Sequence, residues 1–208
     1  LLDELRSFTP DAGSCSFVRQ QAPLGLGHAV WCARDLVGEE PFAVMLPDMI
    51  MVSDPPCLAQ MARAHEETGG NVISVEAVPA EDASKYGIVD VGEATGAGMR
   101  RLNAMVEKPA VDDAPSNLMI SGRYILQPRI FDFLADQGAG AGGEIQLTDA
   151  MVRLMVEQAF HAFEFTGRTY DTGSKLGYLE AFMALALENP QLGGEAATLI
   201  KAVAARID

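Results

Sequence analysis

The sequence predicts an α/β fold with a mostly parallel central sheet. Short apolar runs typical of strands alternate along the chain with segments in which apolar residues recur at helical spacing. Strands separated by helices are typical of βαβ units around a mostly parallel sheet. The chain has 208 residues, of which 49% are hydrophobic and 21% charged. That length and composition suit one large globular domain with a buried core.

The first clear strand lies in FAVMLPD, at residues 42–48. A continuous apolar run that ends at a breaker is typical of a strand buried on both faces. Pro47 cannot donate to a sheet ladder, so we expect the strand to end there. Asp48 would then follow the carboxyl end of a central strand, where open α/β sheets bind ligands. A carboxylate in that place can hold a divalent metal against phosphates, although a turn-forming aspartate is the alternative.

The other elements follow in order along the chain. Apolar runs predict strands at residues 15–19, 72–78, 85–89, 105–108, 118–126 and 160–165. Helical spacing predicts helices at residues 1–7, 28–36, 58–68, 130–135 and 147–159, the third ended by Gly69-Gly70. Residues 175–208 read as a helical tail with breaks near 189–190 and 193–194. With no convincing domain boundary, we expect a single domain over residues 1–208, whose tail packs on it or joins subunits of a homo-oligomer.

Charge and composition exclude several classes of partner. The formal net charge of -14 argues against a nucleic-acid-binding surface but leaves room for a small anionic ligand. No apolar run approaches the roughly 18 residues of a membrane span, so we expect no membrane partner. The three cysteines lack CxxC spacing and suit a reducing compartment, which predicts a cytoplasmic protein.

Two polar or flexible positions precede the helix predicted at residues 28–36. Gly25 and Gly27 lie in LGLG, and glycines before a helix let backbone N–H groups approach an anion. Gln20 ends the strand predicted before this loop, and its amide offers the donor and acceptor that match the edge of uracil. Each residue alone is also compatible with an ordinary loop.

Three further charged residues stand at the end of a predicted strand or in the loop after one. Glu107 could accept hydrogen bonds from sugar hydroxyls, and Lys108 could neutralise a phosphate. Because neighbouring strand residues point to opposite faces, we expect these two to have different roles, unless they form an exposed charge pair. Asp171, in YDTGSK, repeats the placement of Asp48, and two carboxylates at neighbouring strand ends could share one Mg²⁺.

Eight short sequence blocks follow one another between residues 17 and 181. The blocks are FVRQ (17–20), GLGHAV (25–30), LPD (46–48), EDASKYGIVD (81–90), VEKP (106–109), APSN (114–117), GGEIQLTDA (142–150) and DTGSKLGYLEA (171–181). In this order they resemble the bacterial UTP–glucose-1-phosphate uridylyltransferases. Any one block is weak evidence, but eight blocks in the family's order are strong evidence.

The resemblance implies a fold, a reaction and a set of site residues. The fold is a Rossmann-like α/β/α nucleotide-diphospho-sugar transferase fold, and the reaction joins UTP and glucose 1-phosphate to give UDP-glucose and pyrophosphate, with Mg²⁺. By position, Gln20 and Gly25 match the residues at the uracil base, and Asp48 and Asp171 match the metal pair. Gly87, Glu107 and Lys108 match the glucose 1-phosphate site, and Asn117 and Lys175 lie in matching blocks. Two departures, Met49 for a second Asp and Thr172 for a Cys, remove no metal ligand.

One part of the family pattern has no counterpart in residues 1–208. The family begins with a strand and a Gly-rich loop, roughly G-x-G-T-R-x-L-P, and then a K-x-x-P-K segment that cradles the triphosphate. We therefore expect the chain, which starts at Leu1, to be a fragment or to lack an N-terminal piece. Two rival functions stay open: a glucose-1-phosphate thymidylyltransferase of the same fold, and a non-catalytic sugar-nucleotide-binding protein.

Overall fold

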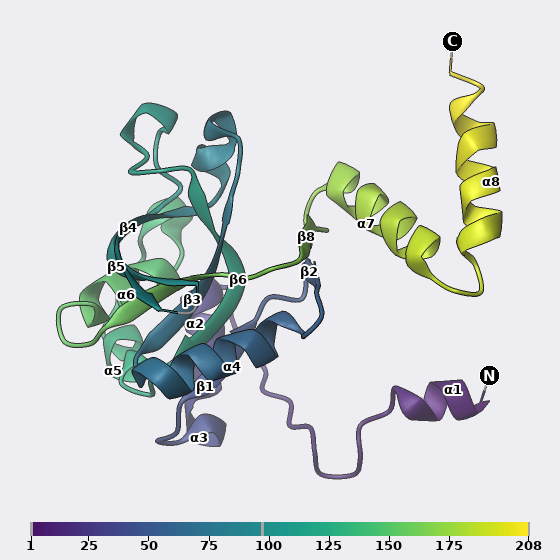
Figure 1. The fold of residues 1–208 in the computed structure, drawn as a ribbon. Helices are drawn as coiled ribbons and strands as arrows, with labels where there is room; N and C mark the ends of the chain where they lie inside the picture. Colours follow the sequence, from purple (N-terminus) through teal and green to yellow (C-terminus); the bar gives the residue numbers. More distant parts are fainter. Residues whose placement is uncertain (1, 97, 208) are drawn as a thin grey trace.

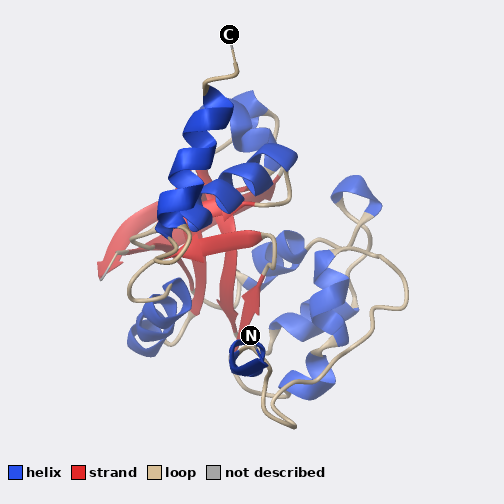
Figure 2. Ribbon diagram, turned by 90° about the vertical axis from the view of Figure 1, so that its right-hand side faces the viewer, coloured by secondary structure: helices blue, strands red, loops and turns tan. Residues whose placement is uncertain are grey.

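A six-stranded sheet with helices on both faces forms the body of the protein (Figures 1 and 2). The computed structural model describes residues 2–96 and 98–207. In it the strands lie in the order β1-β6-β3-β7-β5-β4. Their bounds are β1 (Phe42–Met45), β3 (Asn71–Ala77), β4 (Gly87–Gly96), β5 (Met99–Glu107), β6 (Leu118–Leu126) and β7 (Phe160–Glu164).

This sheet is mostly antiparallel, so the prediction of a mostly parallel sheet is wrong. Strands β3 and β7 are parallel, whereas β6 runs antiparallel to β1, β3 and β4, and β5 runs antiparallel to β4 and β7. An apolar run reports burial on both faces and carries no information on the direction of the neighbouring strand. The α/β class is confirmed.

Helices cover the sheet on both faces because each carries one apolar stripe. Helices α2 (Leu26–Cys32), α5 (Ile130–Ala135) and α6 (Leu147–Leu154) contribute to the core on one face. Helix α4 (Cys57–Thr68) packs on the other with Cys57, Met61 and Ala64. It ends at Gly69, whose φ of 63° is left-handed, as the sequence predicts. The result is a layered α/β/α body, as the resemblance implies.

Several local predictions differ from the structure, and three of them change an element itself. Strand β1 pairs with β6 alone among the described residues and so lies at the edge of the sheet. It is not buried on both faces, since half-buried and exposed residues alternate and Met45 is 54% exposed. Residues 15–19 form no strand; no neighbouring strand hydrogen-bonds to them, and the Phe17 side chain is 97% exposed. The helix predicted at 28–36 is split into α2 and α3 (Arg34–Val37).

A second, two-stranded sheet connects the body to the C-terminal helices. It pairs β2 (Met49–Val52) with β8 (Arg168–Asp171), and neither strand is predicted from the sequence. Helices α7 (Lys175–Glu188) and α8 (Gly193–Ala204) follow and project away from the body (Figure 1). The remaining helices are α1 (Leu2–Ser7) and the 3₁₀ turns Ala80–Lys85, Val111–Asp113 and Ala141–Gly143. Leu1 and Asp208, which the predicted terminal helices include, lie outside the described residues.

A bilayer-spanning helix needs about 20 apolar residues. None of the helices in the described part of the chain has that length and apolarity.

Candidate active site

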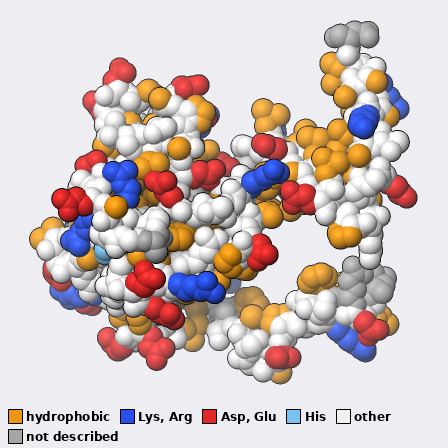
Figure 3. Space-filling model, in the orientation of Figure 1, with side chains coloured by type: hydrophobic (Ala, Val, Ile, Leu, Met, Phe, Trp, Pro, Cys, Tyr) orange, Lys and Arg blue, Asp and Glu red, His pale blue; other side chains and the backbone are white. Residues whose placement is uncertain are grey.

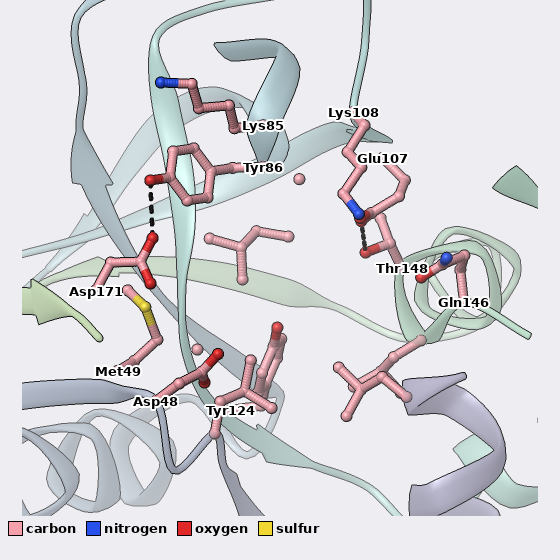
Figure 4. Close-up of a pocket in the computed structure, with 16 residues that line it drawn as sticks. Asp48, Met49, Lys85, Tyr86, Glu107, Lys108, Tyr124, Gln146, Thr148 and Asp171 are labelled. Carbon is pink, nitrogen blue, oxygen red and sulfur yellow. Dashed lines mark hydrogen bonds between the residues drawn. The ribbon is translucent and has the colours of Figure 1, made fainter. Parts of the chain in front are cut away.

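Most of the charged residues singled out in the sequence meet at one cavity of about 280 Å³ (Figure 4). Its walls come from the turn after β1, the start of β4, the end of β5, the middle of β6, the start of α6 and the end of β8. Asp48 and Asp171 lie on one side, and Glu107, Lys108 and Thr148 lie on the other (Figure 4). Segments far apart in the sequence therefore contribute to a single site.

Asp48 is held in a tight turn between β1 and β2. The Met49 amide donates to the Leu46 carbonyl at 3.4 Å, which closes a four-residue β-turn over Leu46–Met49. Pro47 takes the second position of this turn, for which its fixed φ is suited, and Asp48 takes the third. Met49 then turns into the core and is only 6% exposed. The turn thus places the Asp48 carboxylate at the cavity, which the largely buried Met49 also lines.

The two-stranded sheet brings Asp171 beside Asp48. Met49 of β2 is the register partner of Asp171 in β8. Thr172 then donates both its backbone amide and its hydroxyl to the Asp48 carbonyl, each at 2.8 Å. The Asp171 carboxylate accepts hydrogen bonds from the Gly173 amide at 2.9 Å and the Tyr86 hydroxyl at 3.1 Å. These contacts orient the Asp171 carboxylate and hold the backbone of Asp48 beside it.

The geometry and chemistry of this pair fit a small divalent cation. A side-chain Cβ built on Gly173 would lie 3.0 Å from Asp171 Oδ1 and 3.2 Å from Asp48 Oδ2, so both carboxylates converge on space left by a glycine. The described residues offer no group of three or more His, Cys, Asp or Glu side chains for a metal. Two carboxylates with the other positions left to water and phosphate is the usual arrangement for Mg²⁺.

On the opposite wall, Glu107 is the last residue of β5 and pairs with Gly87 of β4. Its Oε2 accepts a hydrogen bond from the Thr148 hydroxyl at 2.6 Å. A Cβ on Gly87 would lie 3.1 Å from the same oxygen, so a larger residue there would crowd the carboxylate. Gly87 therefore gives Glu107 room, and Thr148 fixes its orientation.

Lys108 lines the same cavity as Glu107, contrary to the expectation that the two face opposite sides. Its φ of 46° is left-handed, which ends the strand and breaks the alternation of side chains. The Lys108 amide donates to the Tyr86 carbonyl at 3.0 Å, which anchors this bend. Alternation fails because it applies only while the backbone remains extended.

Two tyrosines at the cavity were not singled out from the sequence. Burial, followed by the hydrogen bond to Asp171, raises the pKa of Tyr86 to about 12. Burial also raises the pKa of Tyr124, with Glu107 and Asp48 adding to the effect. Both hydroxyls therefore remain protonated near neutral pH. Tyr86 lies within the block EDASKYGIVD, but its contact with Asp171 spans 85 positions of the chain, which no local pattern reveals.

Gln20 and Gly25 contact each other but do not line the cavity. The Gln20 amide nitrogen lies 3.0 Å from the Gly25 carbonyl, to which it donates, and 2.9 Å from His28 Nδ1. Gly25 has a φ of 108°, and a Cβ there would lie 2.8 Å from Glu144 Cβ. The glycine thus lets the loop before α2 lie against residues 144–146, and Leu26 and Gln146 from these two segments border the cavity.

The chain is similar in sequence to one family of known proteins. A family model described as nucleotidyl transferase matches residues 3–188. The UTP–glucose-1-phosphate uridylyltransferase of Haemophilus influenzae is 44% identical over 211 residues, which cover 98% of this chain and 72% of that protein.

Solved structures give the same result. The UDP-glucose pyrophosphorylase of Acinetobacter baumannii superposes with a TM-score of 0.86 at 41% identity, covering 97% of this chain and 70% of that one. The UTP-bound UGPase of the same organism gives a TM-score of 0.84 at 41% identity, covering 96% of this chain and 69% of that one. The chain belongs to the UTP–glucose-1-phosphate uridylyltransferases of the nucleotidyl transferase family.

Two other residues of this nucleotidyl transferase lie away from the cavity. Asn117 is exposed. Its side-chain amide donates to the Val78 backbone carbonyl at 2.9 Å, and its backbone carbonyl accepts from the Val78 backbone amide at 3.0 Å. Lys175 is exposed at the start of α7. Neither side chain lines the cavity, so their assignment to the sugar-phosphate site stays a prediction.

Proposed function

We propose that this chain carries the site at which UTP and glucose 1-phosphate are converted to UDP-glucose and pyrophosphate. The observation that carries the proposal is the arrangement of one cavity: Asp48 and Asp171 on one side, and Glu107 with Lys108 on the other. An acidic pair suited to a metal faces a lysine suited to a phosphate. The uridylyltransferase named above, at 44% identity, supports the same assignment.

In the proposed reaction, a phosphate oxygen of glucose 1-phosphate attacks the α-phosphorus of UTP. The new P–O bond forms as the bond to the β-phosphate oxygen breaks, and pyrophosphate leaves with that electron pair. Both reactants are anions, so catalysis rests on positioning and charge neutralisation and needs no covalent enzyme intermediate.

Each residue has a distinct role in this proposal. Lys108 would hold the phosphate of glucose 1-phosphate, and Glu107, oriented by Thr148, would accept hydrogen bonds from sugar hydroxyls. Asp48 and Asp171 would hold Mg²⁺, which, when bound, would neutralise charge on the reacting phosphates. Gln20 and Gly25 would lie at the base. The phosphate lysine and the metal pair thus approach the reacting groups from opposite walls.

Pyrophosphate release measured with UTP and with dTTP tests the proposal. The protein should be the one its gene encodes, including any residues that flank positions 1–208. We expect release that requires glucose 1-phosphate and is faster with UTP. Faster turnover of dTTP would favour a thymidylyltransferase, and no release with either nucleotide would favour a sugar-nucleotide-binding protein. Either result would overturn the proposal.

The location and assembly of the protein complete this proposal. We place the protein in the cytoplasm, because Cys15, Cys32 and Cys57 are all free thiols. We also expect a homo-oligomer in which α7 and α8 contribute contacts. Hydrophobic side chains gather over these helices (Figure 3), among them Leu176 at 80% and Phe182 at 64% exposure. Sedimentation velocity would test this, and a monomer at micromolar concentration would contradict it.

A further inference from the structure

Arg123 is a buried cation that donates hydrogen bonds to both ends of the turn carrying Asp48. Its side chain, on β6, comes from a residue only 8% exposed. One guanidinium nitrogen, Nη1, donates to the Leu46 carbonyl at 2.8 Å and to the Gly122 carbonyl at 3.0 Å. The other, Nη2, donates to the Met49 carbonyl at 2.5 Å. Leu46 and Met49 are the first and last residues of the four-residue turn.

The charge of Arg123 is not compensated by a carboxylate. Within residues 2–96 and 98–207, Arg123 takes part in no ion pair. A buried charge is costly unless hydrogen bonds replace its lost hydration, and here backbone carbonyls supply them. The planar guanidinium can donate to two carbonyls at a fixed separation, which a lysine ammonium cannot do in the same geometry.

Hydrogen bonds with a buried serine hold the backbone of Arg123 in place. Its backbone amide donates to the Ser74 hydroxyl at 3.2 Å, and that hydroxyl donates to the Arg123 carbonyl at 3.1 Å. Ser121 donates to the same Ser74 oxygen at 2.8 Å, and both serines are fully buried. Next to it, Gly122 has a φ of 79°, and a Cβ there would lie 2.8 Å from Met49 Cγ. The turn therefore packs directly on β6.

We propose that Arg123 is a positioning residue for Asp48: by fixing the Leu46–Met49 turn, it holds the Asp48 carboxylate where it meets the Asp171 carboxylate beside Gly173. This inference rests on the proposed function, in which the two carboxylates bind Mg²⁺. Arg123 itself does not touch the substrate or the metal. Residues that orient metal ligands are typically worth 10–100-fold in metal affinity.

The test compares Arg123→Lys with Ser121→Ala in the full gene product. Lys keeps the charge but cannot bridge both carbonyls, whereas Ser121→Ala disturbs the same buried network without touching the turn. Mn²⁺ affinity, measured by the EPR signal of free Mn²⁺, should fall about 10–100-fold in Arg123→Lys. It should stay at the wild-type value in Ser121→Ala. Arg123→Gln provides a second variant that retains amide donors.

A double variant separates this role from a general effect on the fold. If Arg123 acts through Asp48, adding Arg123→Lys to Asp48→Asn should cause no further loss of Mn²⁺ affinity. Equal losses of Mn²⁺ affinity in Arg123→Lys and Ser121→Ala would overturn the inference. Additive losses of Mn²⁺ affinity in the double variant would do so too. So would failure of both Arg123 variants to fold, because Arg123 would then stabilise the whole sheet. Wild-type Mn²⁺ affinity in Asp48→Asn would instead overturn the metal site of the proposed function.

Discussion

The hydroxyl of Tyr86 donates a hydrogen bond to Oδ2 of Asp171 at 3.1 Å. The backbone carbonyl of the same tyrosine accepts the Lys108 amide at 3.0 Å. Tyr86 therefore connects the side of the cavity that carries Asp171 to the bend at Lys108. A small shift of this tyrosine would change the separation between the carboxylate pair and Lys108.

The raised pKa of Tyr86 predicts a titration that Tyr86→Phe removes. Because burial and Asp171 raise its pKa to about 12, the folded protein keeps this tyrosine neutral where an unfolded chain would ionise it, near pH 10. Its contribution to stability is therefore complete below pH 10 and is lost as the pH rises from about 10 to about 12. The difference in tyrosinate absorbance between wild type and Tyr86→Phe should appear near pH 12. A difference centred near pH 10 would contradict the burial of the Tyr86 hydroxyl and its contact with Asp171.

Lys108→Ala tests the phosphate side of the cavity, with Lys85→Ala as its matched control. Both lysines line the cavity, but Lys85 is paired with Asp82 at 2.5 Å. A charge-assisted hydrogen bond is worth about 1.5–3 kcal/mol, so Lys108→Ala should reduce kcat/KM for glucose 1-phosphate by about 10–150-fold. UTP binding should hardly change. Equal losses in the two variants would show that Lys108 contributes only general positive charge.

Thr172→Val tests how the two acidic segments are joined. The variant keeps the shape of the side chain but removes the hydroxyl that donates to the Asp48 carbonyl at 2.8 Å. Because the Thr172 amide still donates to the same carbonyl, we expect a loss of about 0.5–1.5 kcal/mol in the free energy of unfolding. The Mg²⁺ concentration for half-maximal activity should rise. Denaturant unfolding and a Mg²⁺ titration measure both effects, and a change in stability alone would mean that the hydroxyl does not orient Asp48.

Gln20→Glu tests the proposed contact with the base. The variant removes the amide that donates to the Gly25 carbonyl and contacts His28, and it adds a negative charge. Leaving one partner unpaired in a desolvated site costs about 1–3 kcal/mol, so UTP affinity measured by calorimetry should fall by about one to two orders of magnitude. Affinity for glucose 1-phosphate should be unchanged. A parallel fall in both affinities would make Gln20 a structural residue of the loop.

The sequence identifies residues of the site better than it identifies their connections. Asp48, Glu107 and Lys108 could be selected because each follows or ends an apolar run, and Asp171 because it lies between a predicted strand and a predicted helix. All four line one cavity. The contacts of Tyr86 and Arg123 could not, since they join residues 85 and 77 positions apart. No local periodicity contains that information.

The errors in the predicted fold have equally specific causes. Residues 49–52 (MIMV) form an apolar run of only four residues directly after the expected end of β1 at Pro47, and β2 is not predicted there. Its partner β8 is RTYD, whose polar composition gives no strand signal. The antiparallel direction of β6 depends on which strands it lies between, and burial on both faces made it look like a parallel strand. Local patterns thus located the larger strands without fixing their pairing.

Pyrophosphate release by Asp48→Asn and Asp171→Asn, with UTP, glucose 1-phosphate and Mg²⁺, tests the central claim most directly. The amides keep the size of the side chains but lose the charge that would bind the metal. Both variants should fold with wild-type circular dichroism and lose turnover by at least about two orders of magnitude, the loss typical of removing an electrostatic contact to the transition state. Near-normal, Mg²⁺-dependent release in either variant would contradict the assignment of this aspartate pair as the metal site of the reaction.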